Sequence, residues 1–222
     1  MTYLFLKGAH IIAMAYWLGG EWGVFNASRP ITNSKLSLEE RQRHMETSYR
    51  IDILPRTGII LLLPLGLHMG AIGNYHPLDG PWIVGMWIFV AIWLGITFSA
   101  FFNRGTDLGL KLTKMDEAIR YIVIPLLIIF AIYSLVTGWP FPQGWYAAKA
   151  GLYGVALIIG LLLRFIMRDW VLKFRALAEG PNPEIEASLD KRLAYGRMLA
   201  YVYWVVIGTV ALFGVFKGAL LI

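Results

Sequence analysis

The chain contains no cysteine among its 222 residues. This absence excludes disulfide bonds, iron–sulfur clusters held by cysteine, thiolate metal sites and lipid attachment at cysteine. The sequence also lacks a Walker motif, a GxGxxG segment followed by an acidic residue, and an HExxH motif. ATP-driven, dinucleotide-dependent and zinc-protease chemistries therefore have no basis in it. A cofactor must be held by histidine, by other polar side chains or by shape.

Charged residues are scarce: they make up 15% of the chain, whereas 58% is hydrophobic and the mean hydropathy is +0.60. Soluble domains are ~45–50% apolar, so this composition indicates a lipid bilayer. A membrane helix needs roughly 20 mostly apolar residues. The expected fold is all-α, a single domain over 1–222 forming a bundle of six transmembrane helices. The six stretches lie at about 3–25, 53–73, 82–102, 121–139, 146–166 and 199–218.

Lysine and arginine are absent from two of the expected loops, NYHPLDGP and GWPFPQG, and concentrated in the segments 26–50, 103–120 and 164–198. Basic loops collect on the cytoplasmic side of a membrane. We therefore expect both termini outside, in a multi-pass protein of a bacterial-type inner or plasma membrane. The first apolar run is expected to be a retained helix and not a cleaved signal peptide. The net charge of +6 follows from this topology and does not indicate nucleic acid.

Two stretches resemble each other, RIDILPRTGIILLLPLGL from Arg50 and RYIVIPLLIIFAIYSLVTG from Arg120. Each begins with arginine, has proline five residues later and is followed by a short loop and another helix. One interpretation is a duplicated hairpin comprising helices 2–3 and 4–5, since internal repeats are common in membrane proteins. The other is that membrane hairpins in general share this pattern.

Two histidines are expected at nearly the same depth. His10 lies ~10 Å and His68 ~8 Å below the outer edge at the rise of an α-helix. Ionisable side chains inside a membrane are costly and mark functional sites by default. His10 shares one helical stripe with Met14, Trp17 and Glu21, because steps of three, four and seven residues return to one face.

The surroundings of His68 suit a large planar ligand. Gly66 and Gly70 flank it and allow a helix or ligand to approach closely. Neutral imidazoles ligate haem iron from both sides, so the pattern predicts haem b with His10 and His68 as metal ligands. The lining would include Met14, Trp17, Gly66, Gly70 and Lys149. Alternatively, the histidines hydrogen-bond across helices and the GxxxG pattern only packs helices.

The remaining polar residues in or near the expected spans each have a simpler interpretation. Lys149 and Lys7 either face the cofactor pocket or extend to the interface. Glu21 and Arg56 are expected at a similar depth, where an ion pair would lower the cost of both. A proton path or quinone contact is the alternative for that pair. Asp52 is expected at the interface. His76, in the loop after the second helix, is either an alternative ligand or a surface residue, and the surface is favoured.

Several segments resemble the HemJ-type protoporphyrinogen oxidases and their CopD-like relatives, over about half of the chain. The first is Lys7-x-x-His10-Ile11-Ile12 with Trp17 and Gly20. The others are the run from Arg120 with Pro125, the segment GWYAAKAGLYGVALIIG, and the closing VVIGTVALFGVFKG with Lys217.

The resemblance implies a small helical membrane protein that binds haem b through His10, with Lys149 as a functional pocket residue. Arg120 and Pro125 match structural or pocket positions. This chain departs from the pattern in its two additional helices, at about 53–102, which include His68.

The sequence thus favours a haem b membrane redox protein that passes electrons in the outer half of the bilayer, with quinone or HemJ-like porphyrinogen chemistry. The alternative is a non-catalytic membrane subunit that anchors or assembles a larger complex, because the chain has abundant aromatic surface. The third hypothesis is CopD-like copper transport. Soft ligands select Cu(I), but the eight methionines are scattered.

Overall fold

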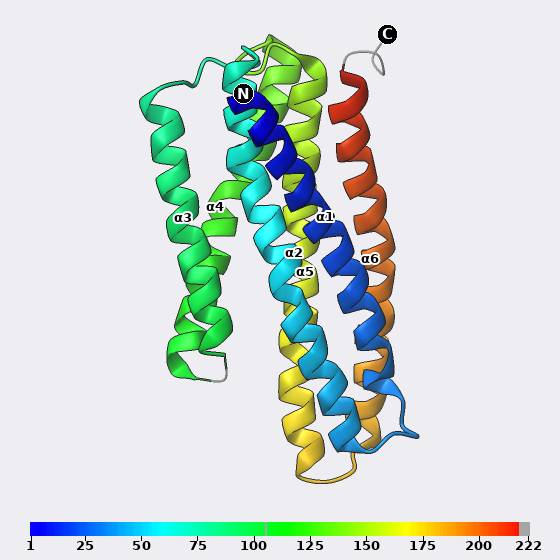
Figure 1. Cartoon of the computed structure of the whole chain (residues 1–222). Coiled ribbons are helices and arrows are strands. Elements are labelled where there is room, and N and C mark those ends of the chain that lie inside the picture. The colour runs from blue at the N-terminus through cyan, green and yellow to red at the C-terminus, as the bar shows by residue number, and fades with distance from the viewer. Residues whose placement is uncertain (105, 218–222) are drawn as a thin grey trace.

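The computed structural model describes residues 1–104 and 106–217, and in this part of the chain all regular structure is helical (Figure 1). The all-α fold class is therefore confirmed. Its elements are α1 (Thr2–Ser28), the 3-10 helix η1 (Arg29–Thr32), α2 (Leu38–Ile72), α3 (Pro81–Phe102), α4 (Asp107–Thr137), α5 (Gly144–Ala178) and α6 (Pro183–Phe216).

Five helices, α2 to α6, are long and apolar enough to cross a membrane. The length and composition of these helices are those of a multi-pass membrane protein. The first helix, α1, is 27 residues long but is not among the five. It contains Lys7, His10 and Glu21, each of which lowers its hydropathy.

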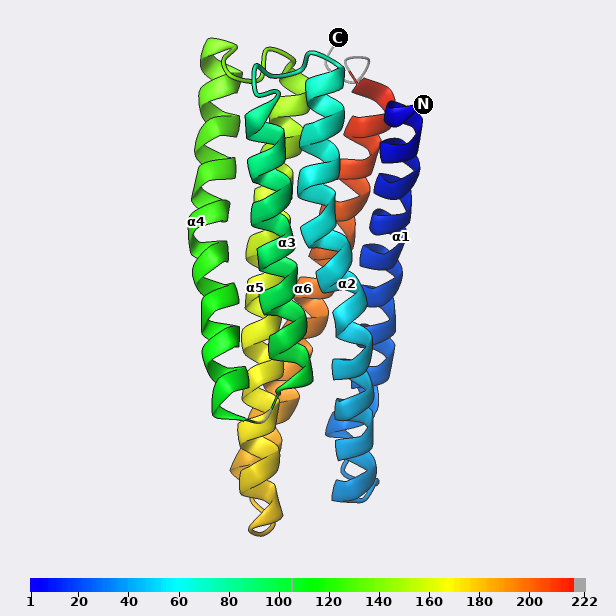
Figure 2. The same ribbon diagram turned by 60° about the vertical axis from the view of Figure 1, so that its left-hand side comes forward.

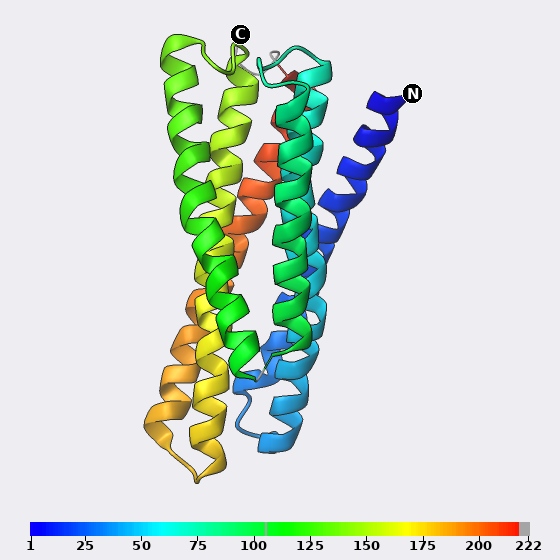
Figure 3. The ribbon, with the colours of Figure 1, turned by 90° about the vertical axis from the view of Figure 1, so that its left-hand side faces the viewer.

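The helices run side by side and turn back at two ends of the bundle (Figure 2). The N-terminus, the loops 73–80 and 138–143 and the last turn of α6 lie at one end, called here the neutral end. The opposite end, with η1 and the α3–α4 and α5–α6 connections, is called the basic end. The first half of α1 leans away from the other helices (Figure 3).

The basic segments expected as loops are largely helical, which corrects the sequence-based boundaries. α2 begins at Leu38, α4 at Asp107, and only residues 179–182 separate α5 from α6. Local signals account for the starts of α2 and α6. Ser37 and Glu40 form a capping box in which each side chain accepts from the other's backbone N–H, and Asn182 caps α6.

Tertiary contacts hold the basic end together. Arg41 is buried, donates through Nε to the carbonyl of Ile31 at 2.7 Å and makes a bidentate pair with Glu186 at 2.7 and 2.8 Å. Tyr49 donates its hydroxyl hydrogen to the carbonyl of Met167. These bonds join η1, α2, α5 and α6, so the polar extensions form a packed part of the bundle.

The contact between α1 and α2 depends on glycine. A Cβ at Gly58 would lie 2.5 Å from the carbonyl oxygen of Ala13, and one at Gly20 would collide with the ring of Pro55. Only a residue without a side chain permits this approach. The close packing fixes which face of α1 looks into the bundle, and His10 and Trp17 lie on that face.

Candidate functional site

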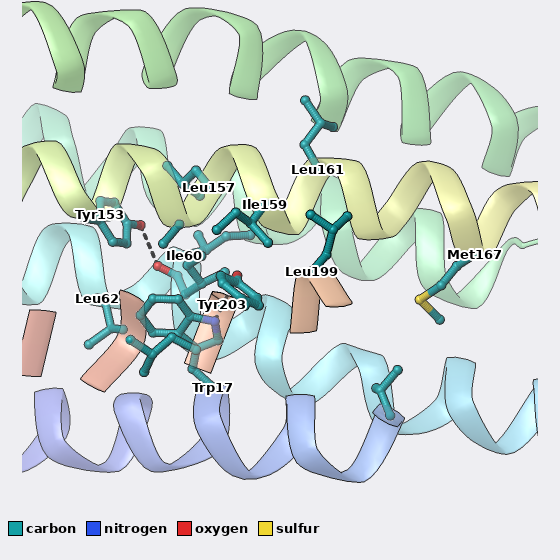
Figure 4. Packing of buried hydrophobic residues seen from close by; sticks show 14 of the residues in the cluster. Trp17, Ile60, Leu62, Tyr153, Leu157, Ile159, Leu161, Met167, Leu199 and Tyr203 are labelled. Atoms are coloured by element: carbon teal, nitrogen blue, oxygen red, sulfur yellow. Dashed lines mark hydrogen bonds between the residues drawn. The ribbon is translucent and has the colours of Figure 1, made fainter. Parts of the chain in front are cut away.

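An aromatic layer crosses the bundle interior at its middle (Figure 4). The indole Nε1 of Trp17 donates to the hydroxyl of Tyr203 at 3.0 Å, and both rings pack edge-on. Tyr153 packs edge-on against Trp17 and donates to the carbonyl of Ile59 at 2.6 Å. All the polar atoms of these three side chains are thereby hydrogen-bonded. The layer lies between two cavities, one toward each end of the bundle.

The cavity on the neutral side, called the neutral-half cavity, contains about 500 Å³ of space not filled by protein atoms. Its walls are mostly aliphatic, with a few polar groups among them. They comprise His10, Trp17, Leu62, Leu63, Gly66, Leu67, Leu127, Tyr146, Lys149, Ala150, Tyr153 and Val210.

His10 lines this cavity without a polar partner. Its Nδ1 is fully buried and has no hydrogen bond within the described chain. Gly66 stands opposite: a Cβ built there would lie 3.6 Å from Cε1 of His10. Buried polar atoms are nearly always hydrogen-bonded, and an exception calls for an explanation such as an unseen ligand. Met14, expected beside His10, packs against the hydrophobic core instead.

Lys149 lies in the same cavity as His10, as the depth argument predicted. Its ammonium lies against Gly214 of α6, where a Cβ would collide with Nζ. The side chain forms no hydrogen bond or ion pair with any residue between 1 and 104 or 106 and 217. Lys7, which had the same two interpretations, is exposed and does not line the cavity.

Tyr146 closes the neutral end of this cavity. Its hydroxyl donates to the carbonyl of Gly66 at 3.2 Å, and it lies where a Cβ of Gly70 would otherwise be. Of the two glycines that flank His68 in sequence, Gly70 makes room for Tyr146, whereas Gly66 lies at ordinary contact distance from His10. The predicted close approach at Gly70 occurs, and the approaching side chains are this tyrosine and His76.

The structure does not bring His68 into the cavity with His10. Its Nδ1 accepts from Nε1 of Trp87 on α3 at 3.2 Å. Gly66 faces α1, and two residues further along an α-helix the side chain has turned by about 200°. His10, which belongs to α1, therefore approaches α2 on the side of Gly66, whereas His68 projects from a different side of α2.

His76, expected at the surface, is buried, with 6% of its surface exposed. Its Nδ1 accepts from the backbone N–H of Leu78 at 3.1 Å, so Nε2 carries the hydrogen and donates to the carbonyl of Leu67 at 2.8 Å. Both ring nitrogens are engaged, and the ring ties the loop 73–80 to α2. The surface expectation was therefore wrong, and the role of this side chain is structural.

The second cavity, called the basic-half cavity, contains about 740 Å³ of space not filled by protein atoms. It lies between the α1–α2 pair and the α5–α6 pair, with Arg120 reaching in from α4. Its polar lining consists of Glu21, Ser28, Asp52, Arg56, Arg120, Arg164, Arg197, Trp170 and Tyr203.

Glu21 and Arg56 both line this cavity, as their predicted depths require. The ion pair of Arg56, however, is with Asp52 one turn earlier on α2. Asp52 itself is buried, which corrects its expected place at the interface. Glu21 has no hydrogen bond or ion pair to another residue in the described ranges.

Sequence reasoning missed Asp116, which is 1% exposed. It accepts hydrogen bonds from Trp93 Nε1 at 2.7 Å and Thr97 Oγ1 at 2.9 Å, and it pairs with Arg120 and Arg164. Residues 103–120 were expected to form a loop, so this carboxylate was placed outside the membrane. The i, i+4 spacing of Asp116 and Arg120, typical of a helix, was the available signal.

Within the described chain, no group of three or more histidine, cysteine, aspartate or glutamate side chains is arranged to hold a metal ion. A comparison with known protein families, curated proteins and solved structures found no match to this chain.

Proposed function

We propose that the chain is a membrane redox protein that holds haem b in the neutral-half cavity. The observation that carries the proposal is the half-buried imidazole of His10, whose Nδ1 is buried without a hydrogen bond among the described residues, in an apolar cavity that also contains Lys149. A neutral imidazole with a free ring nitrogen is able to ligate haem iron. The resemblance of the first helix to HemJ-type proteins favours the same cofactor.

The lining supports this cofactor in its chemistry. Leu62, Leu63, Leu67 and Val210 offer aliphatic walls to a flat macrocycle, and Gly66 leaves space beside His10. Hydrophobic walls with few polar groups are typical of cofactor sites. His10 would hold the iron, and the aliphatic walls would keep water from it. Haem supplies a one-electron redox centre when bound.

Lys149 would pair with a haem propionate. Its ammonium faces the cavity and has no partner in the described chain, and burying an isolated cation is costly. A carboxylate from a ligand removes that cost through a charge-assisted hydrogen bond. His68 is not included as a ligand in this proposal, because its ring faces Trp87.

The proposed orientation places the basic end in the cytoplasm of a bacterial-type inner membrane, following the bias of lysine and arginine. Both termini and the haem cavity then lie toward the outer face. In this arrangement α1 is the sixth span, because it lies along α2 and turns its polar residues His10 and Glu21 into the two cavities. The electron partner would be a quinone or a porphyrinogen.

The partial repeat plays no part in this function. Arg50 is exposed and pairs with Glu46, whereas the corresponding Arg120 is buried and pairs with Asp116. The two arginines thus have different surroundings, and the duplicated hairpin stays a prediction.

The test is a dithionite-reduced minus oxidised absorption spectrum of the purified, haem-supplied protein, with His10→Ala and His68→Ala. We expect a b-type spectrum that is lost in His10→Ala and kept in His68→Ala, the matched control. Loss in both folded variants would favour bis-histidine ligation. A folded wild type without haem would contradict the proposal and favour an anchoring subunit of a larger complex.

A further inference from the structure

The basic-half cavity has chemistry that haem binding does not use. It lies beyond the aromatic layer from His10, and its lining mixes guanidinium groups with apolar side chains. Charged groups at membrane depth are retained where they face a cavity or one another. The question is which ligand would match this set of groups.

The arginines of the cavity outnumber their carboxylate partners. Arg56 is paired with Asp52. Arg120 and Arg164 share the single carboxylate of Asp116. Arg197 is half-buried on α6 and has no hydrogen bond or ion pair to the described residues. With Glu21, which also lines the cavity, three carboxylates stand against four arginines, so positive charge remains that the described residues do not neutralise.

A second, independent observation comes from Trp170. This side chain lines the cavity and is 3% exposed, yet its indole N–H has no acceptor among the described residues. A buried donor left without an acceptor is destabilising. A ligand that brings a hydrogen-bond acceptor would satisfy it.

The rest of the wall is apolar. It includes Val24, Phe25, Ile59, Leu163, Ile166 and Met167. A small soluble anion would leave these side chains uncovered, whereas a ligand with an apolar body would cover them.

We propose that the basic-half cavity binds an amphiphile with an oxyanion head group and an apolar chain. The head lies among the guanidinium groups, which recognise carboxylate and phosphate through paired N–H donors. The same chemistry is offered by a long-chain carboxylate and by an acidic phospholipid. The proposal does not depend on haem binding, because the two cavities have no lining residue in common.

Native mass spectrometry of the detergent-purified full chain, with or without haem, tests the proposal. The probes are oleate, with oleyl alcohol as its neutral match, and dioleoylphosphatidylglycerol, with dioleoylglycerol, which lacks the phosphate, as its neutral match. Tighter binding of oleate than of its match assigns a carboxylate head. Tighter binding of phosphatidylglycerol than of its match assigns a phosphate head. Equal binding of charged and neutral matches would overturn the proposal.

Arg197→Gln should weaken binding of the charged probe about tenfold, the effect of one lost charge-assisted hydrogen bond. Arg192→Gln is the matched control, because Arg192 is on the same helix, 55% exposed, and outside the cavity. Trp170→Phe should weaken binding several-fold while keeping most of the ring. Equal effects of the two arginine substitutions would overturn the assignment.

Glu21→Gln tests the sign of the charge on the ligand's head group without the removal of an arginine. At a pH where Glu21 is ionised, its carboxylate repels an anionic head, so the amide should there bind the charged probe more tightly. A neutral ligand that used Glu21 as a hydrogen-bond partner, such as a quinone, would instead bind less tightly. Weaker binding of oleate and of phosphatidylglycerol to Glu21→Gln would therefore contradict an oxyanion site.

Discussion

Trp17 on the first helix and Tyr203 on the last are joined by a buried hydrogen bond of 3.0 Å between the indole N–H and the phenol oxygen. The residues are 186 positions apart in sequence. Their contact belongs to the aromatic layer that separates a cavity with one free histidine from a cavity with several arginines. The bond thus links α1 to α6 and is part of the layer that divides the interior of the bundle.

Tyr203→Phe should destabilise the folded state by about 1–3 kcal/mol, because it leaves the buried N–H of Trp17 without an acceptor. The measurement is the free energy of unfolding in mixed micelles titrated with denaturing detergent. Tyr201→Phe is the control, since Tyr201 is 57% exposed and on the same helix. Equal stability of the two variants would show that the hydrogen bond contributes nothing.

Asp116→Asn should cost about 3–5 kcal/mol, the range found when one partner of a buried ion pair is removed. The substitution leaves the guanidinium groups of Arg120 and Arg164 without a carboxylate. The same unfolding measurement applies, with the exposed Asp190→Asn as control. A variant as stable as wild type would contradict a buried, charged cluster at this position.

Gly58→Ala should separate α1 from α2, since the added Cβ would lie 2.5 Å from the carbonyl oxygen of Ala13. We expect a loss of about 1–3 kcal/mol, as for other overpacked interiors. Gly95→Ala is the matched control, because nothing lies within 4 Å of its Cβ. Alanine is the better helix former, so that variant should equal or exceed wild type in stability by up to ~1 kcal/mol.

Lys149→Gln should lower haem affinity about tenfold, if the ammonium neutralises a propionate through one charge-assisted bond. Haem titration followed by absorbance gives the affinity. Lys7→Gln is the control, as Lys7 is exposed at the same end of the bundle. Unchanged affinity in Lys149→Gln, with a b-type spectrum intact, would leave His10 as a ligand and remove Lys149 from the site.

Much of the helical layout was predictable because hydropathy and helical periodicity are properties of each segment alone. The stripe through His10, Trp17 and Glu21 does face the interior, and Lys149 does share a cavity with His10. The basic segments were misjudged because charge was taken to end a helix. In fact helices continue beyond the apolar part where caps such as Ser37 and Asn182 start them.

By itself, the sequence determined the membrane class, the apolar parts of the helices and the face of α1 on which His10 lies. Tertiary structure decided that His68 faces Trp87, that His76 is buried, and that Asp116 pairs with two arginines. The physical reason is that periodicity fixes the direction of a side chain only relative to its own helix. How each helix is rotated against its neighbours depends on contacts such as Gly58 with Ala13, which exist only in the packed bundle.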